Sequence, residues 1–443
     1  MGFHRCKSVL LSSVVGALLA SCNNGVCNTS SVGVLQVSKP VKELLYTGES
    51  TTATVSLVGS SGVSTPVLVT VTSENPNDMT VTPYSCSLTS AVNSCQVTLT
   101  ALKAGEVKIS ASADGYAPVT SKIAVVIKNM FAYIINDSND ALIGLGTPPS
   151  DGGYTQCNVG VNGIESASCT TNTSSIFSQP SAIAFNKGYA YFVNYGDNSY
   201  VYCLVNESGI ESETCAKVEL AGATMDNSRG IAFAGNYAYI TNTGIESYVQ
   251  CNVTATGLIE SSTCTDVALS NTYYSTEITI ESNYAYIMNS VSYRDYSYLQ
   301  CVTNASGLIN ANSCNLVSLG YLFASGGLGS VAAPATVAFS GTYSYMTDSY
   351  HDVYIQCSVG ATGVESNNCI KVSPKDLSDN NLLDSPMGVA FNNSFAYFVN
   401  RSNNYTQCNV SGAGLVESAS CANYTPSGIG ALNRPNGIAF YGL

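Results

Sequence analysis

Residues 230–264 read GIAFAGNYAYITNTGIESYVQCNVTATGLIESSTC and hold four short runs rich in β-branched and aromatic residues. The runs cover residues 230–233, 237–242, 248–253 and 257–264, and Gly, Asn and Ser bound them. Several of the runs alternate apolar with polar residues, which is the pattern of strands rather than helices. The segment therefore predicts four antiparallel strands joined by tight turns.

The same four runs recur along the chain, and a pair of cysteines marks each copy. Successive first cysteines are 46 to 56 residues apart. They are Cys157, Cys203, Cys251, Cys301, Cys357 and Cys408. Four strands in about 50 residues is the size of one propeller blade. The repeats therefore predict an all-β fold in which residues 129–443 form a β-propeller.

The two ends of the repeat region indicate the number of blades. The chain closes with NGIAF at residues 436–440, a first strand without a second, while residues 131–136, FAYIIN, match a second strand without a first. We therefore expect the C-terminal strand to complete the first blade and close a six-bladed ring. The recurrent Tyr-x-Tyr-[Ile/Phe]-x-Asn segment resembles the repeats of the NHL and YVTN-type propeller families. That resemblance covers residues 130–443 and implies an architecture, with little information on function.

The chain has 17 cysteines, a content typical of proteins that fold in an oxidising compartment. In each repeat the two cysteines lie in the third and fourth expected strands, which face each other in a hairpin. A disulfide there would stabilise each blade by about 3 kcal/mol and restrain its outermost strand. Zinc ligation is disfavoured, because the Cys-x11-12-Cys spacing has no histidine nearby. The expected pairs are Cys86–Cys95, Cys157–Cys169, Cys203–Cys215, Cys251–Cys264, Cys301–Cys314, Cys357–Cys369 and Cys408–Cys421.

The N-terminus has the pattern of an export signal. Basic residues precede an apolar stretch, residues 9–19, that is too short for a permanent membrane span. Residues 19–22, LASC, resemble the lipobox of bacterial lipoproteins, in which Cys22 would receive a lipid after removal of residues 1–21. The alternative is an ordinary signal peptide followed by an incidental cysteine. Buried acyl methylenes at about 0.8 kcal/mol each would hold the chain on a membrane.

The residues after the lipobox bear on the expected location. Asn23, rather than Asp, follows the lipid-bearing cysteine, which resembles sorting to the outer membrane. We expect a lipoprotein of the cell envelope, periplasmic or surface-exposed, with residues 22–32 as a flexible lipidated tether. Cys27 in this tether is either a free thiol or the source of an intermolecular disulfide.

Charge and composition limit the kinds of partner. Without Arg5 and Lys7, which leave with the signal, the chain carries 14 basic and 29 acidic residues, a net charge of −15. This balance argues against nucleic acid as a partner. Only 10% of residues are charged, while Ser, Thr, Asn, Gly and Tyr are abundant, as in turn-rich all-β proteins displayed outside the cytoplasm.

Residues 33–128 are expected to form a separate domain. Apolar and polar residues alternate in residues 52–57, 67–71, 96–100 and 122–127, with turn signals between them. The segment resembles a bacterial immunoglobulin-like β-sandwich, although it lacks the tryptophan of antibody domains. We interpret it as a spacer between the membrane and the propeller.

Common catalytic motifs are missing from the sequence. It contains no Gly-x-Ser-x-Gly, Gly-x4-Gly-Lys or His-Glu-x-x-His motif. His351 is the only histidine after the signal segment, and we interpret it as a solvated loop residue rather than a general base. We therefore predict no catalytic residue, no cofactor and no metal ligand.

A short polar residue ends the second expected strand of every repeat. These residues could each close an Asx-type turn before the third strand. Together they could instead form an axial site for a divalent cation, as in the gluconolactonase-like propellers, although one acidic ligand among six makes such a site weak. The six are Asn136, Asn194, Asn242, Asn289, Asp348 and Asn400.

Loop length varies between repeats at one end of the expected blades. Turns between first and second strands and between third and fourth strands are nearly constant, whereas the other two classes differ widely. Such variation tends to mark the functional face. The longest variable segments are residues 137–153, residues 315–334 with exposed-looking Tyr321 and Phe323, and residues 371–386. We therefore place the candidate binding face there and expect it to point away from the membrane.

The leading hypothesis for function is a non-enzymatic binding or adhesion protein, tethered to a membrane, that presents this variable face to a protein or glycan. The rival hypothesis is a lactonase or other hydrolase with an axial metal at the channel mouth. A scaffold for an envelope complex would differ from the adhesion protein only in its partner.

Overall fold

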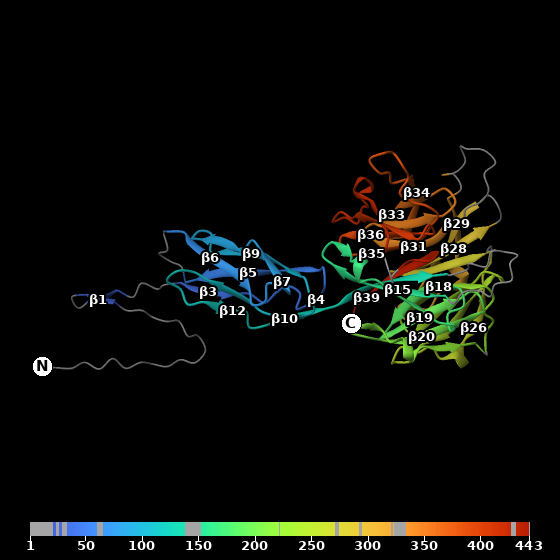
Figure 1. The fold of residues 1–443 in the computed structure, drawn as a ribbon, viewed down its shortest axis with the longest axis horizontal. Coiled ribbons are helices and arrows are strands. Elements are labelled where there is room, and N and C mark those ends of the chain that lie inside the picture. Colours follow the sequence, from blue (N-terminus) through green and yellow to red (C-terminus); the bar gives the residue numbers. More distant parts are fainter. Residues whose placement is uncertain are drawn as a thin grey trace. The chain divides into compact units, whose positions relative to one another are not determined.

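The computed structural model of the chain describes residues 21–23, 26–28, 33–59, 65–137, 152–220, 222–270, 274–291, 295–319, 322, 334–426 and 431–442. The chain divides into two compact units, Met1–Lys128 and Asn129–Leu443. Regular structure in the described residues consists of strands and short 3-10 helices, so the fold is all-β as predicted (Figure 1). None of the helices in these residues is long and apolar enough to cross a membrane.

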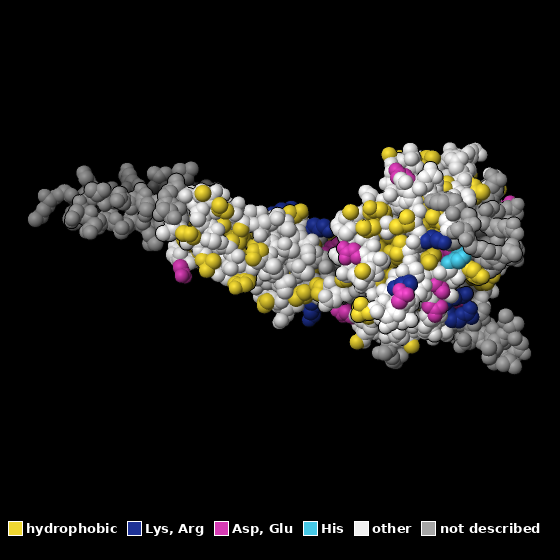
Figure 2. All heavy atoms as spheres, turned by 90° about the horizontal axis from the view of Figure 1, so that it is seen from above, with side chains coloured by type: hydrophobic (Ala, Val, Ile, Leu, Met, Phe, Trp, Pro, Cys, Tyr) yellow, Lys and Arg dark blue, Asp and Glu magenta, His cyan; other side chains and the backbone are white. Residues whose placement is uncertain are grey.

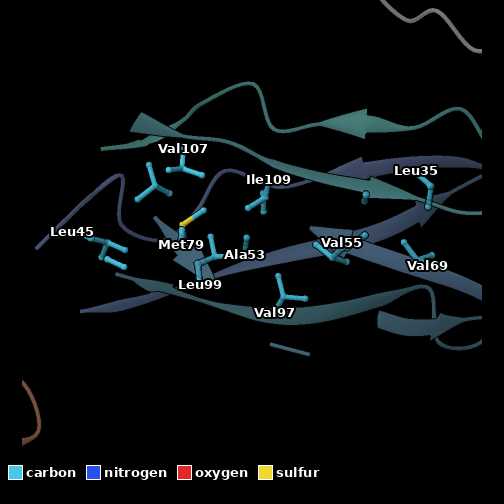
Figure 3. Close-up of a cluster of buried hydrophobic side chains, with 14 of the residues drawn as sticks. Leu35, Leu45, Ala53, Val55, Val69, Met79, Val97, Leu99, Val107 and Ile109 are labelled. Carbon is cyan, nitrogen blue, oxygen red and sulfur yellow. The ribbon is translucent and has the colours of Figure 1, made fainter. Parts of the chain in front are cut away.

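The described part of residues 33–128 holds three sheets around one apolar core (Figure 3). The first sheet has the order β3 (Val34–Val37), β5 (Ser50–Val58), β9 (Ser94–Ala101) and β7 (Met79–Thr82). The second has the order β12 (Val119–Thr120), β11 (Ile109–Ser112), β6 (Val67–Ser73) and β8 (Ser85–Leu88). The third has the order β10 (Gly105–Val107), β13 (Val125–Lys128) and β4 (Leu44–Tyr46). A separate hairpin, β1 (Ser21–Asn23) and β2 (Val26–Asn28), precedes them.

Alternating side chains explain why these segments form strands around a core. Ala53, Val55 and Leu57 are buried on one face of β5, while the threonines and serines between them stay partly exposed. Val97 and Leu99 of β9 are buried in the same cluster (Figure 3). An apolar side chain every second residue places all the apolar groups on one face of the strand. The alternation noted in the sequence therefore marks the core-facing positions.

The described part of residues 129–443 forms six antiparallel sheets, one for each sequence repeat. The first repeat holds β14 (Met130–Asn136), β15 (Gly153–Gly160), β16 (Gly163–Ile164) and β17 (Thr170–Thr173), joined by β39 (Pro435–Gly442). The second holds β18 (Pro180–Asn186), β19 (Tyr189–Asn194), β20 (Ser199–Asn206), β21 (Gly209–Ile210) and β22 (Ala216–Val218). The third holds β23 (Ser228–Ala234), β24 (Tyr237–Asn242), β25 (Ser247–Asn252) and β26 (Thr265–Ala268).

The remaining three repeats follow the same plan. The fourth holds β27 (Ser275–Glu281), β28 (Tyr284–Val291), β29 (Asp295–Val302) and β30 (Asn315–Ser318). The fifth holds β31 (Pro334–Ser340), β32 (Tyr343–Asp348), β33 (Val353–Gly360) and β34 (Gly363–Val372). The sixth holds β35 (Pro386–Asn392), β36 (Phe395–Asn400), β37 (Asn404–Asn409) and β38 (Ala422–Tyr424).

The first strands of the sheets surround a common cavity. Each first strand contacts the next, in the order β18, β23, β27, β31, β35 and β39, and β39 contacts β18 again. All six contribute to the lining of a cavity of about 260 Å³. β39 pairs with β14, with Ile438 opposite Ile134, so the C-terminal strand completes the first sheet as predicted. The unit therefore has a β-propeller-like fold, with small sheets arranged around a central channel.

Aromatic residues pack each sheet against the next. The second tyrosine of the Tyr-x-Tyr segment lies against the phenylalanine of the following first strand, as in Tyr191 and Phe233, whose ring centroids are 4.8 Å apart. Tyr397 of the sixth repeat contacts Phe440 of β39 at 4.9 Å in the same way. Such pairs add about 0.5–1.5 kcal/mol each beyond the burial of their area. The repeated Tyr and Phe positions are therefore the contacts between neighbouring sheets.

The fourth strands differ from the sequence prediction. Residues 257–264 of the third repeat hold an isolated bridge and a 3-10 helix, Ser261–Thr263, and β26 begins only after the second cysteine. The hydroxyl of Thr263 causes this, because it donates to the Glu260 carbonyl at 2.7 Å and accepts from the Asn252 backbone N–H at 2.9 Å. In the fifth repeat Asn368 stands at the position of Thr263, and there β34 runs as a continuous strand.

Candidate functional site

The two ends of the sheets have loops of different kinds. At one end, which we call the constant end, two residues separate the first strand from the second in repeats two to six. At the other, the variable end, the connections into the first strands range from six residues, 174–179, to 15 residues, 319–333. Turns between second and third strands also lie at the variable end, because neighbouring strands are antiparallel. The candidate site is therefore sought among the residues of the variable end.

Hydrogen bonds between repeats explain why the turns at the constant end are alike. The hydroxyl of Tyr239 in β24 donates to the carbonyl of Gly307 in the next repeat at 2.7 Å. Gln407 of the sixth repeat donates to the carbonyl of Asn162 in the first repeat at 2.9 Å. Equivalent tyrosine bonds are made by Tyr191 and Tyr345, and equivalent glutamine bonds by Gln156 and Gln300. A longer turn would lose these bonds, so the constant end joins neighbouring repeats.

The six polar residues that end the second strands lie at the variable end and are buried. Their exposed fractions are 0 or 1%. They are Asn136, Asn194, Asn242, Asn289, Asp348 and Asn400. Since a buried polar group without a partner costs about 1–3 kcal/mol, each side chain is expected to have partners within the protein. The six therefore occupy equivalent interior positions, one in each sheet.

Asn242 illustrates how these asparagines hold the loops. Its Oδ1 accepts hydrogen bonds from the backbone N–H of Asp226 at 3.1 Å and from the hydroxyl of Ser228 at 2.7 Å. Its Nδ2 donates to the carbonyl of Thr224 at 2.8 Å and to the hydroxyl of Ser247 at 3.2 Å. The side chain therefore joins the connection before the first strand to the start of the third strand. Similar two-sided bonding is made by Asn136, Asn194 and Asn400.

Asp348 in the fifth repeat uses its side chain differently. Its Oδ1 accepts from the backbone N–H groups of Tyr350 at 3.0 Å and His351 at 3.1 Å, which is an Asx-type turn. Its Oδ2 lies 2.7 Å from His351 Nδ1. His351 is therefore a loop residue held by a buried carboxylate. In the part of the chain that the structure describes, no three His, Cys, Asp or Glu residues cluster as metal ligands would.

The long variable loops are described only in part. Tyr321 and Phe323, and residues 138–151, lie outside the described residues. The connection of residues 373–385 is described, and Asp376 Oδ1 accepts from the backbone N–H groups of Ser378 at 2.8 Å and Asn380 at 2.9 Å. Leu377 at its tip is fully exposed. This loop offers a solvent-facing apolar side chain on a hydrogen-bonded turn.

One acidic residue, Glu277 of β27, lies on the wall of the central cavity. Its carboxylate accepts a hydrogen bond from the backbone N–H of Ile278 at 3.2 Å. Burial within the ring of strands raises the pKa of Glu277 to about 8, and the bond from Ile278 opposes that rise. The corresponding residues of three other first strands are Gly230, Gly388 and Gly437. The sequence signal for this carboxyl group is an acidic residue at a position where three other first strands have glycine. Glu277 was not among the predicted site residues.

Three arginines at the variable end were not predicted as site residues: Arg401 lies within electrostatic reach of both Arg229 and Arg434. Each lies at or beside the end of a strand, so the signal that could have found them is their position relative to the repeats. Figure 2 shows Lys or Arg side chains together with Asp or Glu side chains near the histidine on the face in view, among mostly uncharged residues.

The seven predicted disulfides are present among the described residues. In the third repeat, for example, Cys251 of β25 is bonded to Cys264, which directly precedes β26. The bonds therefore fasten the outermost strand of each repeat to its neighbour. Disulfides in this number indicate folding in an oxidising, extracytoplasmic compartment.

Neither the scan against protein-family models nor the search of curated proteins gives a match. Among solved structures, the chain is similar to a chain of a nidogen–laminin complex, with 9% identity, a TM-score of 0.48, and 70% of this chain and 98% of that chain covered. It is also similar to a proposed 6-phosphogluconolactonase from Bacteroides uniformis ATCC 8492, with 11% identity, a TM-score of 0.47, and 85% and 99% covered. A second proposed 6-phosphogluconolactonase, from Bacteroides fragilis NCTC 9343, has 11% identity, a TM-score of 0.46, and 86% and 99% covered. Identities this low leave function to be argued from the chain's own residues.

Proposed function

We propose that this protein is an extracytoplasmic binding or adhesion protein whose variable end recognises a protein or glycan. The observation that carries the proposal is the difference between the two ends of the repeats. Hydrogen bonds between neighbouring repeats keep the constant end uniform, as for Tyr239 and Gln407. Buried asparagines such as Asn242 hold the bases of the variable loops instead.

Rigid loop bases favour recognition, because a preorganised surface loses less conformational entropy on binding. The side chain of Asn242 fixes two chain segments at once, so the loops beyond them can differ in sequence without altering the sheet. The buried polar residues therefore act by positioning the loops, and the exposed loop residues make the contacts. Leu377 is one such contact residue, and Tyr321 and Phe323 are proposed as others.

The proposal includes an architecture and a location. The six sheets are the blades of a six-bladed propeller of the NHL or YVTN type, and residues 33–128 are an immunoglobulin-like spacer. Residues 1–21 are a signal peptide, and lipidation of Cys22 anchors the mature chain to the outer membrane through the tether of residues 22–32. The content of disulfides supports a location outside the cytoplasm. The sequence LASC at residues 19–22 supports the lipid anchor.

A lactonase or hydrolase is the alternative that the channel suggests. Such an enzyme needs a general base or a metal at the channel mouth. The candidates on the described residues are Glu277 in the cavity and the His351–Asp348 pair. Binding is favoured over catalysis because these two groups lie in different repeats, and no three His, Cys, Asp or Glu residues cluster as metal ligands would in the part of the chain that the structure describes.

The proposal is tested by measuring binding to arrays of glycans and extracytoplasmic proteins. We expect the protein to retain at least one ligand, and replacement of residues 376–380 by Gly-Ser-Gly-Ser-Gly to weaken that binding at least tenfold. Lys187→Gln at the constant end is the control and should bind as the wild type does. Equal binding by the loop variant and the wild type would remove this loop from the binding face. Turnover in a screen of small esters and lactones would support the enzyme instead.

A further inference from the structure

Three arginines gather at the variable end, although the chain is poor in arginine. The sequence has five arginines, at positions 5, 229, 294, 401 and 434, and a net charge of −13. Arg229, Arg401 and Arg434 belong to the third, sixth and first repeats and are far apart in sequence. The closed ring of sheets brings the guanidinium group of Arg401 within electrostatic reach of both others. A chance grouping of this kind would be costly, because like charges repel.

The three residues lie around the mouth of the central channel. Arg229 is the second residue of β23, and Arg434 directly precedes β39. Arg401 directly follows β36. First strands begin and second strands end at the variable end, and the first strands line the cavity. The cluster is therefore at the end of the channel that carries the variable loops.

The fold does not require arginine at these positions. The backbone of Arg434 has a φ of 47°, in the left-handed region, where it forms the turn into β39. Gln179, Asn227 and Ser385 occupy the same place before other first strands, with φ values of 49°, 51° and 51°. The turn is thus made equally well by uncharged residues. The positive charge of Arg434 needs an explanation other than the backbone.

Among the described residues, Asp137 is the acidic residue that faces Arg401. Arg401 Nη2 lies 3.4 Å from Asp137 Oδ2, a long ion pair, and Arg401 Nε is buried without a hydrogen bond among the described residues. Burial lowers the pKa of Arg401, the nearby Arg434 and Arg229 lower it further, and Asp137 opposes them. Asp197, an acidic residue of the neighbouring loop, is already paired with Lys217 at 2.9 Å. A negatively charged ligand would relieve this repulsion and supply the missing acceptor.

The protein's own contacts hold the arginines in place. The guanidinium carbon of Arg229 lies 4.1 Å from the centroid of the Tyr195 ring, a cation–π contact. The backbone N–H of Arg434 donates to Asn403 Oδ1 at 2.7 Å. The backbone N–H of Arg401 donates to the carbonyl of Ser385 at 3.2 Å. Because the backbones of Arg401 and Arg434 and the guanidinium group of Arg229 are held before a ligand arrives, binding would lose less conformational entropy.

We propose that Arg229, Arg401 and Arg434 bind an oxyanion, a carboxylate or a phosphate group, carried by a small ligand at the channel mouth. The planar guanidinium fork matches both groups with paired hydrogen bonds. A polyanion such as nucleic acid is disfavoured, because its many charges would meet the negative field of the whole protein. A single oxyanion feels chiefly the charges within about 10 Å, the screening length at ordinary salt. This inference rests on the proposed function and names the chemistry of its ligand.

The test is calorimetric titration of the full disulfide-bonded protein with inorganic phosphate, glucuronate and, as an uncharged probe, glucose. We expect one of the two anions to bind at least tenfold more tightly than glucose. Raising the salt from 50 to 500 mM should weaken that binding several-fold. Binding of glucuronate alone would assign a carboxylate ligand, and binding of phosphate alone a phosphate ligand. Failure of both anions to bind would overturn the inference.

Variants separate the site from general charge effects. Arg229→Gln and Arg401→Gln should each weaken the anion at least tenfold, while Lys187→Gln, which removes the same charge at the constant end, should change it less than twofold. Arg401→Lys keeps the charge and should retain part of the affinity, which guards against a folding defect. Anion binding that survives all the arginine variants would overturn the site. Failure of the inference is distinguishable from failure of the proposed function, because replacement of residues 376–380 tests the macromolecular ligand separately.

Discussion

The constant and variable ends of the repeats both use buried side chains as hydrogen-bonding groups, but these side chains hold different parts of the chain. At the constant end, side chains such as Tyr239 bond to the turn of the neighbouring repeat, so each turn must keep its length. At the variable end, side chains such as Asn242 bond to loops of their own repeat. Bonds between loops of neighbouring repeats, such as that from the Arg434 N–H to Asn403 Oδ1, add to this support. Bonds of this kind hold the bases of the variable loops, so the loops above them can differ in length.

The largest contrast between the ends is expected from insertions. Four residues, Gly-Ser-Gly-Ser, inserted after Gly235 at the constant end should cost more than about 4 kcal/mol or prevent folding. A Cβ on Gly235 would already lie 2.1 Å from the carbonyl oxygen of Ser306 in the next repeat. The same insertion after Leu377 lengthens a 13-residue connection to 17 residues, so loop closure should cost only about 0.2 kcal/mol more. Thermal unfolding of both variants measures the difference, and equal costs would remove the distinction between the ends.

The second contrast concerns the polar groups that hold the variable loops. Asn242→Ala removes four hydrogen bonds made by a buried side chain and leaves the backbone groups of Thr224 and Asp226, which are only partly buried, without these partners. We expect it to lower the free energy of unfolding by roughly 3 kcal/mol. Asn252→Ala, at an exposed position in the same repeat, is the control and should change it by less than about 0.5 kcal/mol. Denaturant unfolding measures both, and a neutral Asn242→Ala would mean that the loops are held in another way.

Glu277 in the central channel makes the free energy of unfolding depend on pH. Glu277 has a pKa of about 8 in the folded protein and an ordinary value of 4.5 when unfolded. The folded state therefore keeps a proton that the unfolded state loses, so stability is greatest below pH 4.5 and falls as the pH rises to 8. Relative to Glu277→Gln, the wild type should lose about 2 kcal/mol over this window, roughly half of what the full shift would give, because Glu277 borders the cavity and is only partly buried. Unfolding curves for the two proteins that stay parallel from pH 4.5 to 8 would contradict the burial of this carboxyl.

Much of the fold could be predicted because it is encoded locally and repeated. Alternating residues, two-residue turns and paired cysteines recur in every repeat, and the unmatched segments at residues 131–136 and 436–440 predict the pairing of β39 with β14. The fourth strand was misplaced because one hydroxyl, that of Thr263, takes the backbone groups that the strand would use. That effect depends on a single side chain and leaves no trace in the hydrophobic pattern.

The candidate site was harder to predict, because its parts meet only in three dimensions. The polar residues that end the second strands were found from their position in each repeat, but the burial of Asn242 depends on loops that pack above it. Arg229, Arg401 and Arg434 lie in three repeats, and the closure of the ring brings them together. An isolated arginine at a strand end carries no signal of its own. Comparing equivalent positions across the repeats would have suggested these arginines, because most other repeats have uncharged residues there.

The smallest expected effect concerns the hydrogen bonds of the constant end, which a comparison of two tyrosines can separate from packing. Tyr239 and Tyr248 are both fully buried in neighbouring strands of the third repeat, with ring centroids 5.7 Å apart. The hydroxyl of Tyr239 donates to the carbonyl of Gly307 at 2.7 Å and accepts from the backbone N–H of Ile309 at 3.2 Å. The hydroxyl of Tyr248 has no hydrogen-bond partner in the described residues. The two tyrosines thus differ in bonding and not in burial.

Tyr239→Phe should therefore lower the free energy of unfolding by about 1–2 kcal/mol, because it removes two bonds and leaves the Gly307 and Ile309 groups unpaired. Tyr248→Phe should be neutral or slightly stabilising, since it removes a buried hydroxyl that has no partner. Both substitutions keep the aromatic ring, so packing against neighbouring sheets is unchanged. If the two variants unfold at the same denaturant concentration, the bonds of the constant end add nothing to stability. The uniform turns would then have to be explained by packing alone, as at Gly235, whose place against Ser306 admits no larger residue.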